Sequence, residues 1–244
     1  MPPKPQKVES ALERVLAMRG GGGHEWYSAH MDAYYEQSEQ PRIDPGWFHP
    51  SALDHVCDAF LAFEFLGLPQ PAGQVSAQLR RIFDNGHSSE ARKQEAIKRA
   101  GLARLSKKER SFEIPQYRVR GECDNIIKHP LTGELWIWEH KTMREDRFDA
   151  LKAPLPAWVT QCHFYMFGKG VLQTLVEVEC KNCQAVKTFA VPFDGALWKK
   201  LTGRLERILA RLGERQEIAR TPVPRDSECP FYSQCAGYDF GAAR

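Results

Sequence analysis

Residues 134–141, ELWIWEHK, alternate in the manner of a β-strand and decide the architecture expected for the chain. Because successive side chains of a strand point to opposite faces, Glu139 and Lys141 share one face, while Trp138 and His140 share the other. A carboxylate and an amine on the same face of a mostly apolar strand indicate a functional pair. A salt bridge at a strand end would give the same pattern, so Glu-X-Lys alone is weak support for a catalytic site.

Strand and helix patterns surround this segment in alternating order. The expected strands lie at residues 112–120, 122–128, 134–141, 172–179 and 186–192, and the expected helices at 74–100, 156–168 and 195–217. An earlier helix is expected to begin at Ser51, with Asp54 as the acidic partner of a capping box, and to end at Gly67. This order predicts an α/β fold with a central mixed sheet flanked by helices.

The chain is expected to consist of a flexible N-terminal extension, residues 1–45, and one compact domain, residues 46–244. The extension has a helical pattern at residues 8–19, then consecutive glycines at 20–23 that can act as a hinge, then a polar stretch rich in Tyr and Gln. A loosely attached arm without a function of its own is the simplest interpretation of this composition.

Asp124 lies fifteen residues before Glu139, on the partner strand of a predicted hairpin whose turn is HPLTG, residues 129–133. Folding of this hairpin brings the two carboxylates to one end of the sheet, where they repel each other unless a cation lies between them. Oxygen ligands of this kind favour Mg²⁺ or Mn²⁺. The Lys141 ammonium points to the same place and can stabilise charge developing on a phosphate. These residues predict metal-assisted phosphodiester hydrolysis.

With these elements, the sequence resembles the PD-(D/E)XK nuclease superfamily and, within it, the RecB-like exonuclease branch, which includes CRISPR-associated RecB-like and phage exonucleases. The similarity covers residues 48–236 and rests on the order and spacing of several short motifs. These motifs are Ser51 to Cys57, Asp84-Asn85-Gly86-His87, Gly121-Glu122-Cys123-Asp124, Glu139-His140-Lys141, and Gln161 to Tyr165. Cys123 and His140 depart from the usual residues at positions that vary in the pattern, so the catalytic assignment is unaffected.

The resemblance implies a restriction-endonuclease-like core and a DNA nuclease, expected to be an exonuclease acting in DNA recombination, repair or phage DNA processing. The implied catalytic residues are Asp124, Glu139 and Lys141. The implied ligands of Mg²⁺ or Mn²⁺ are His87, Asp124, Glu139 and the main-chain carbonyl of His140. A single histidine on a helix is more often an ordinary surface or core residue, so the role of His87 rests on the resemblance.

Gln161 and Tyr165 are four residues apart and share a face of the helix expected at 156–168. In the resembled branch this face adjoins the active site and contacts the DNA strand. A helix that simply packs with its tyrosine inward is the competing interpretation.

The seven cysteines favour metal ligation over disulfides, because the cytosol keeps thiols reduced. Cys57, Cys229 and Cys235 match positions at which iron–sulfur members of the resembled branch bind a [4Fe–4S] cluster. That cluster needs four thiolates, and Asp226 occupies the place of the fourth, so Zn²⁺ with an oxygen or imidazole ligand is an alternative.

Cys180 and Cys183 form a C-X-X-C pattern at the tip of a predicted hairpin, as in many zinc knuckles. Together with Cys229 and Cys235 they would complete a site of four thiolates. Cysteines that are merely small buried residues are a further alternative.

The overall composition fits a globular protein, with a net charge of +3, 42% hydrophobic residues and 27% charged residues. This charge neither demands nor excludes nucleic acid. No apolar run approaches the roughly 20 residues that span a bilayer. We therefore expect a cytoplasmic protein without membrane association. The resemblance implies a bacterial or phage-infected cell and DNA as the partner. A recombination or replication protein as a further partner, and the oligomeric state, are left open.

Two other functions are compatible with these patterns. One is a catalytically silent, nuclease-like module that binds DNA or a protein, and the other is a structural zinc protein. A silent site would have no reason to keep His87, Asp124, Glu139 and Lys141 together. Magnesium-dependent cleavage would favour the enzyme, whereas tightly bound zinc without cleavage would favour the structural protein.

Overall fold

The computed structural model describes residues 25–37, 44–69, 76–221, 229–231, 235 and 237–240. The helix and glycine hinge expected within residues 8–23, and Asp226, lie outside them. The chain divides into two compact units, one formed by residues 1–42 and 70–87, the other by residues 43–69 and 88–244. The boundary expected between residues 45 and 46 stays a prediction. In the described ranges, no helix is long and apolar enough to cross a membrane.

The smaller unit contains helix α2 (Glu25–Gln37) and the first part of helix α4 (Ala77–Arg99). Arg81 of α4 forms an ion pair with Asp32 of α2 and lies over the ring of Tyr35, 5.0 Å from its centroid. Helix α2 shows that part of the polar stretch that precedes residue 45 is helical.

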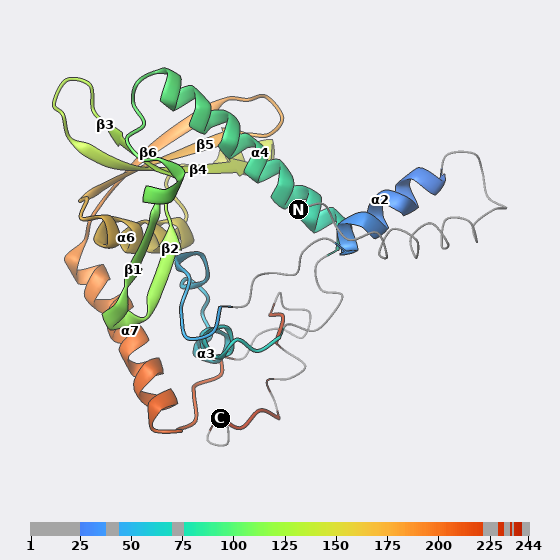
Figure 1. Cartoon of the computed structure of the whole chain (residues 1–244), viewed down its shortest axis with the longest axis vertical. Coiled ribbons are helices and arrows are strands. Elements are labelled where there is room, and N and C mark those ends of the chain that lie inside the picture. The colour runs from blue at the N-terminus through green and yellow to red at the C-terminus, as the bar shows by residue number, and fades with distance from the viewer. Residues whose placement is uncertain are drawn as a thin grey trace. The chain divides into compact units, whose positions relative to one another are not determined.

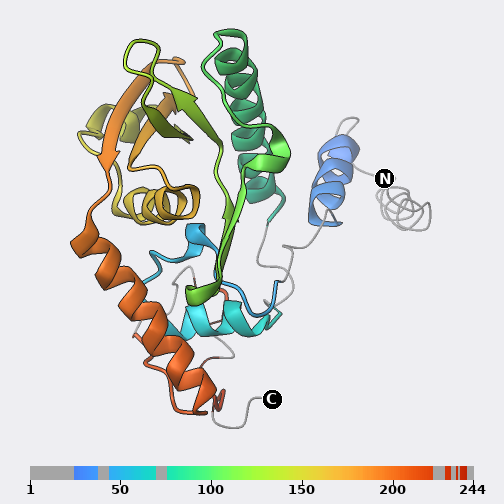
Figure 2. The ribbon, with the colours of Figure 1, turned by 60° about the vertical axis from the view of Figure 1, so that its left-hand side comes forward.

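The central sheet has the strand order β3-β4-β5-β6 and is mixed (Figures 1 and 2). Strand β3 (Asn125–Lys128) runs antiparallel to β4 (Leu135–Met143), and β4 runs parallel to β5 (Gln173–Cys180). Strand β5 is in turn antiparallel to β6 (Val186–Pro192). The predicted fold class, α/β with a central mixed sheet flanked by helices, is confirmed.

Helices cover both faces of this sheet. The His140 side chain of β4 contacts Ser89 in the part of α4 that belongs to the larger unit, whereas the neighbouring Lys141 contacts Gln161 of α6 (Pro156–Lys169). Because adjacent residues of a strand face opposite sides, α4 and α6 lie on opposite faces of the sheet. Strand β4 thus has a different set of partners on each side.

Two more helices follow strands of the sheet. Helix α5 (Glu145–Ala150) begins two residues after β4 and was not predicted. Helix α7 (Gly195–Gly213) follows β6, and the Asp194 carboxylate caps it by accepting hydrogen bonds from two main-chain N–H groups of its first turn. The predicted helix at 195–217 is confirmed but ends earlier.

The single strand predicted at residues 112–120 is wrong, because the structure has two strands there. Strands β1 (Ser111–Ile114) and β2 (Val119–Glu122) form a separate antiparallel pair joined by the 3-10 turn Pro115–Tyr117. The fixed backbone angle of proline and its missing N–H end β1 at this point. Strand β3 likewise begins at Asn125, later than the predicted residue 122.

The capping role predicted for Ser51 is also wrong. Residues Pro50–Ala52 form a short 3-10 helix, and α3 (Asp58–Leu66) begins later with Cys57 at its N-cap and no side-chain cap. The proline at the start of the segment directs the chain into this separate turn. Gly67, with a φ of 69°, ends α3 as predicted.

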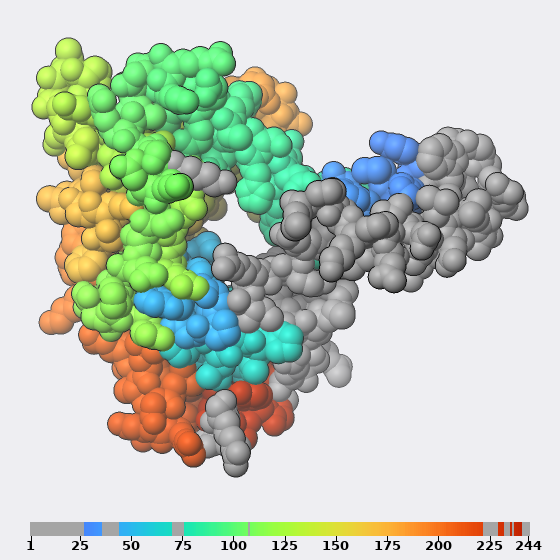
Figure 3. All heavy atoms as spheres, viewed as in Figure 1, coloured from blue at the N-terminus to red at the C-terminus, as the bar shows by residue number. Residues whose placement is uncertain are grey.

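The turn between β3 and β4 stands out from the surface (Figure 3). The main-chain N–H of Gly133 donates to the His129 carbonyl at 3.0 Å, and Leu131 within this turn is 91% exposed. The hairpin predicted around HPLTG is present, so β3 and β4 are neighbours, as the candidate site requires.

Candidate active site

Asp124 and Glu139 lie side by side because of the register of the β3–β4 hairpin. Asn125 pairs with Trp138, so the next residue outward on each strand, Asp124 and Glu139, also face each other. The main-chain N–H of His140 donates to Asp124 Oδ2 at 2.7 Å and fixes that carboxylate at the strand end. Asp124 is half-buried and Glu139 is 2% exposed.

The Glu139 carboxylate has one paired and one unpaired oxygen. Its Oε1 atom lies 2.6 Å from Lys141 Nζ, while its Oε2 atom is buried without a hydrogen-bond partner among the described residues. Burial raises the pKa of Glu139, the Lys141 ammonium opposes this, and the charge of Glu90 adds to it. A buried carboxylate oxygen with a free lone pair is an available ligand for a cation.

Asp124 is in an equally unfavourable electrostatic environment. Burial raises the pKa of Asp124, and the negative charges of Glu139 and then Glu90 raise it further, against the hydrogen bond from His140. Three carboxylates therefore act on one another at this end of the sheet, with Lys141 as the counter-charge.

Glu90 is a site residue that the sequence did not single out. It lies on α4, half-buried, and its carboxylate is 3.5 Å from the guanidinium of Arg110. Arg110 also donates to the main-chain carbonyl of Asp124 at 3.0 Å, which ties α4 to the start of β3. The available signal was helical spacing, because Glu90 is three residues after His87 and shares its helix face.

Lys141 is held by a short chain of buried side chains from α6. Its Nζ atom donates to Gln161 Oε1 at 3.0 Å, and Gln161 Nε2 donates to the Tyr165 hydroxyl at 2.6 Å. Burial alone would lower the pKa of Lys141, but the Glu139 carboxylate outweighs it and raises the pKa, so the amine stays charged. Gln161 is 9% and Tyr165 5% exposed, so in this geometry both residues support Lys141.

The two histidines expected at the metal occupy different places. His87 is exposed on α4, within the smaller unit. The imidazole of His140 is buried on the opposite face of β4 from Glu139 and stacks on Trp138, with ring centroids 5.6 Å apart. Only main-chain atoms of His140 lie on the side of the carboxylates, as the strand alternation requires. The metal-binding roles of both residues stay predictions.

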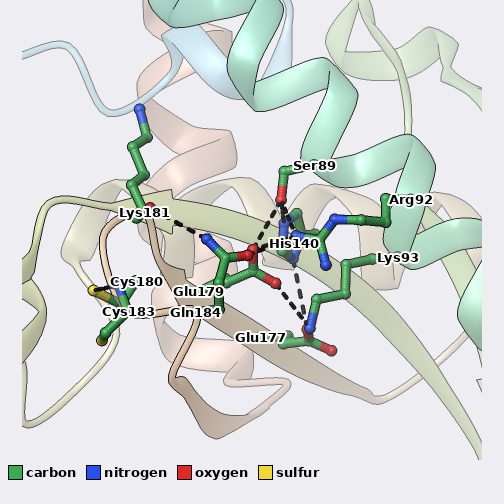
Figure 4. A network of polar contacts seen from close by, with 10 residues as sticks. All are labelled: Ser89, Arg92, Lys93, His140, Glu177, Glu179, Cys180, Lys181, Cys183 and Gln184. Atoms are coloured by element: carbon green, nitrogen blue, oxygen red, sulfur yellow. Dashed lines mark hydrogen bonds and ion pairs between the residues drawn. The ribbon is translucent and has the colours of Figure 1, made fainter.

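The face of β4 opposite the carboxylates carries a polar network, drawn in Figure 4. Ser89 Oγ lies 2.9 Å from His140 Nε2. Ser89 immediately precedes Glu90, and His140 immediately follows Glu139. This contact therefore fixes the helix and the strand to each other one residue away from each carboxylate.

Charged pairs extend the same network along β5 (Figure 4). Lys93 of α4 lies 2.6 Å from Glu177 and 3.0 Å from Glu179, and Arg92 forms a second ion pair with Glu179. Glu179 is nearly fully buried, and these hydrogen-bonded cations lower its pKa although burial raises it. Removing the cations would leave the buried Glu179 charge unpaired, so these ion pairs help to hold α4 on the sheet.

The chemistry of the donor set fits a hard divalent cation. Asp124, Glu139 and Glu90 offer carboxylate oxygens, one of them a buried oxygen without a partner, and their mutual repulsion favours a cation. Among the residues that the structure describes, these oxygens do not all lie within 4.8 Å of one another. The three carboxylates are thus near one another, but their oxygens are not close enough to bind one ion without some side-chain movement.

Cys57, Cys229 and Cys235 lie in one region of the larger unit. Burial raises the pKa of the Cys229 thiol, and nearby Cys57 and Cys235 contribute to this. Rings of the C-terminal segment pack on α3, with Phe63 stacked on Phe240 at 5.1 Å. Among the described residues, the sulfurs of the three predicted cluster ligands do not all lie within 4.8 Å of one another, and their shared metal stays a prediction.

Cys180 and Cys183 lie elsewhere, at the β5–β6 turn, which Figures 1 and 2 place at the opposite end from the C-terminal segment. The four-thiolate site that would combine them with Cys229 and Cys235 is not formed. The described neighbour that completes their group is Glu145.

No protein-family model matches the chain, and no curated protein is significantly similar to it. The chain is similar to the crystal structure of SSO0001, with a TM-score of 0.53 and 14% identity over 85% of this chain and 94% of that one. It also aligns with the alkaline exonuclease LHK-Exo from Laribacter hongkongensis, with a TM-score of 0.47, 13% identity, and coverage of 69% of this chain and 89% of that one. For LHK-Exo in complex with dAMP, the TM-score is 0.49 and the identity 14%, with the same coverage. At such identity the likeness to SSO0001 concerns the fold alone.

Proposed function

We propose that the chain is a metal-dependent DNA nuclease of the PD-(D/E)XK superfamily, and more narrowly a RecB-like exonuclease. The observation that carries this proposal is the buried Glu139 carboxylate, which has one oxygen without a partner, faces Asp124, and lies 2.6 Å from the Lys141 ammonium. Negative charge gathered beside a buried amine suits a cation and a phosphate group. The sequence motifs support DNA as the polymer.

The ligands of the cation, Mg²⁺ or Mn²⁺, would be the carboxylates of Asp124, Glu139 and Glu90. His87 and the main-chain carbonyl of His140 are further ligands implied by the sequence resemblance. A divalent ion bound there would supply Lewis-acid chemistry and would make water a better nucleophile.

The side chains of this site have separate tasks. Asp124 and Glu139 would hold the cation at the end of the sheet. Lys141 remains protonated and offers its ammonium to an oxygen of the scissile phosphate, which stabilises the charge that grows as the bond breaks. The Gln161 amide oxygen accepts a hydrogen bond from that ammonium, and the Gln161 amide nitrogen donates to the Tyr165 hydroxyl, so the amine needs little reorganisation.

Cleavage of end-labelled DNA tests this proposal. Single-stranded and double-stranded substrates are incubated with Mg²⁺, with Mn²⁺ or with chelator, and sealed circular DNA is compared with its linear form. We expect metal-dependent release of nucleotides from linear DNA only. If circular DNA is cut as fast as linear DNA, the protein is an endonuclease and the exonuclease proposal is wrong. If no DNA is cleaved under any condition, a catalytically silent binding module is favoured.

The variant Lys141→Ala distinguishes cleavage by this protein from cleavage by a contaminating nuclease. It removes the ammonium and leaves the carboxylates in place. Its matched control is Lys187→Ala, whose amine binds carbonyl oxygens of Phe148, Asp149 and Leu151 away from the carboxylates. We expect loss of cleavage only in Lys141→Ala. Recombination, repair or phage DNA processing in the cytoplasm is the setting that the proposal implies.

Cys57, Cys229 and Cys235 suggest a second metal site in the same protein, because they match the cluster positions that the sequence resemblance implies. Cys57 on the approach to α3 and Cys229 and Cys235 after α7 would share a [4Fe–4S] cluster or Zn²⁺, with the fourth ligand open. Such a site would join distant parts of the chain. A structural zinc protein without nuclease activity is the alternative that this group favours.

A further inference from the structure

Three ligand atoms meet at the end of the parallel strand pair β4–β5. The Cys180 and Cys183 sulfurs and a carboxylate oxygen of Glu145 all lie within 4.8 Å of one another. Met143, the last residue of β4, is paired with Cys180, the last of β5, and Glu145 is the first residue of α5. The group therefore sits where one strand turns into a helix and the other into a hairpin.

The backbone around these residues is already ordered for ligation. The Lys181 N–H donates to the Met143 carbonyl at 2.8 Å, and the Glu145 N–H donates to Asn182 Oδ1 at 3.3 Å. The turn after β5 is thereby tied to the segment that carries Glu145. Binding of an ion would therefore require little additional ordering of the chain.

A main-chain hydrogen bond is directed at one of the two sulfurs. The Cys183 N–H points to Cys180 Sγ at 3.4 Å. Burial raises the pKa of the Cys180 thiol, but this bond, the Cys183 thiol and the Asn182 N–H outweigh burial and lower it. The hydrogen bond to Cys180 raises the pKa of the Cys183 thiol.

We propose that Glu145, Cys180 and Cys183 bind one thiophilic divalent cation, with Zn²⁺ as the expected ion and water in the fourth position. Zn–S bonds of about 2.3 Å place two thiolates about 3.8 Å apart in a tetrahedral site, within reach of the spacing present here. Thiolates disfavour Mg²⁺, so this site does not compete for the ion of the carboxylates. Among the described residues, no fourth His, Cys, Asp or Glu joins the group.

The ion would fasten the start of α5 to the β5–β6 turn. Cys183 and Glu145 are exposed, so the ion can enter from solvent, while Cys180 is buried and anchors the site. Gln184, the next residue, accepts a hydrogen bond from Arg92 at 3.2 Å, which continues the connection to α4 (Figure 4). The inference is independent of the nuclease proposal, because it concerns other residues and another class of ion.

Metal stoichiometry tests the site without any cleavage assay. The full chain is purified under reducing conditions, stripped with chelator, and titrated with Zn²⁺ and separately with Co²⁺. We expect the wild-type chain to bind one more equivalent of Zn²⁺ than Cys183→Ser, whose exposed position spares the fold. The Co²⁺ form should show thiolate charge-transfer absorption that Cys183→Ser weakens.

Two carboxylate variants complete the test. Glu145→Gln should release Zn²⁺ faster to a competing chelator, while Asp146→Asn, which alters the adjacent exposed carboxylate, should behave as wild type. Equal Zn²⁺ stoichiometry in wild type and Cys183→Ser overturns the proposal. A Cys180–Cys183 disulfide that persists in reductant, with no ion bound, overturns it as well.

Discussion

The main-chain N–H of His140 donates to Asp124 Oδ2 at 2.7 Å, while the imidazole of the same residue lies 2.9 Å from Ser89 Oγ on the other face of the sheet. One residue therefore holds a candidate metal ligand with its backbone and a neighbouring helix with its side chain. This relationship explains why His140 matters although its ring is turned away from the carboxylates.

Asp124→Asn should abolish cleavage and stabilise the metal-free protein. Because the pKa of Asp124 is raised in the folded protein, ionising this carboxylate costs stability as the pH rises above its unfolded-state pKa. The amide keeps an oxygen that can accept the His140 N–H. Chemical denaturation in chelator should show a higher free energy of unfolding for the variant, and this gain should shrink as the pH falls and the wild-type carboxylate takes up its proton.

Added Mg²⁺ is the control for this prediction. The ion should stabilise the wild-type chain by binding its native state and should stabilise Asp124→Asn much less. Wild-type cleavage by the Asn variant would contradict the assignment of Asp124.

Glu90→Gln should weaken the response to Mg²⁺. Loss of this charge relieves Asp124 and Glu139 of repulsion but removes a candidate ligand, so cleavage should fall about tenfold or more at limiting Mg²⁺ and recover in part at high Mg²⁺. The matched control is Glu95→Gln, which affects only an exposed pair with Arg99 on the same helix. Equal Mg²⁺ titrations of both variants would remove Glu90 from the site.

Tyr165→Phe should lower turnover more than substrate affinity. The ring and its packing on Phe112 remain, but Gln161 Nε2 loses its acceptor and the amide that holds Lys141 is free to rotate. We expect kcat to fall while KM changes little, since the fault lies in positioning. Tyr117→Phe, at a half-buried tyrosine packed on Trp198, is the control. An unchanged kcat would indicate that Gln161 and Tyr165 of α6 serve only to pack the core.

Cys235→Ser should release a metal ion or cluster and lower the melting temperature. A site shared with Cys57 and Cys229 would contribute to folding, because it joins segments far apart in the chain. Metal analysis identifies the element, and a brown colour of the wild-type protein would indicate iron rather than zinc. Cys183→Ser should leave this second metal in place. Metal-free protein with unchanged melting would contradict a shared site.

Gly168→Ala should destabilise the fold, although alanine ordinarily favours a helix. A Cβ atom at Gly168 of α6 would overlap the ring of Phe112 on β1, and overpacking of this kind costs about 1–3 kcal/mol. Gly203→Ala on α7 is the opposite case, because its nearest neighbour is a flexible arginine 3.7 Å away, and it should gain up to about 1 kcal/mol. Equal unfolding midpoints for the two variants would contradict this packing.

The hairpin was predictable because a strand has a fixed period. Alternation in residues 134–141 places Glu139 with Lys141, and the turn at 129–133 sets which residue lies opposite them. Both signals are local, so they could be recognised without knowledge of the tertiary packing. The mixed sheet and the helices on its two faces followed from the same periodicity.

Other features depend on contacts that no local pattern encodes. Glu90 looks like any exposed helix residue until α4 is placed against β4, and the network around Glu179 exists only after β5 lies beside β4. The Ser51 capping motif was misleading because Pro50 forms a separate turn and α3 begins at Asp58. The grouping of Glu145 with two cysteines depends on the register between β4 and β5, which no local sequence pattern predicts.

The two faces of β4 imply that a substitution scan along this strand should give two kinds of effect at alternating positions. Changes at Glu139 and Lys141 should abolish activity in a folded protein, whereas changes at Trp138 and His140 should unfold it, so the phenotype would oscillate with a period of two residues. A one-residue insertion before Trp138 would exchange the two sets, pointing the acid at the α4 network and the imidazole at the place of the cation. For this strand, shifting the frame would be more damaging than any single replacement.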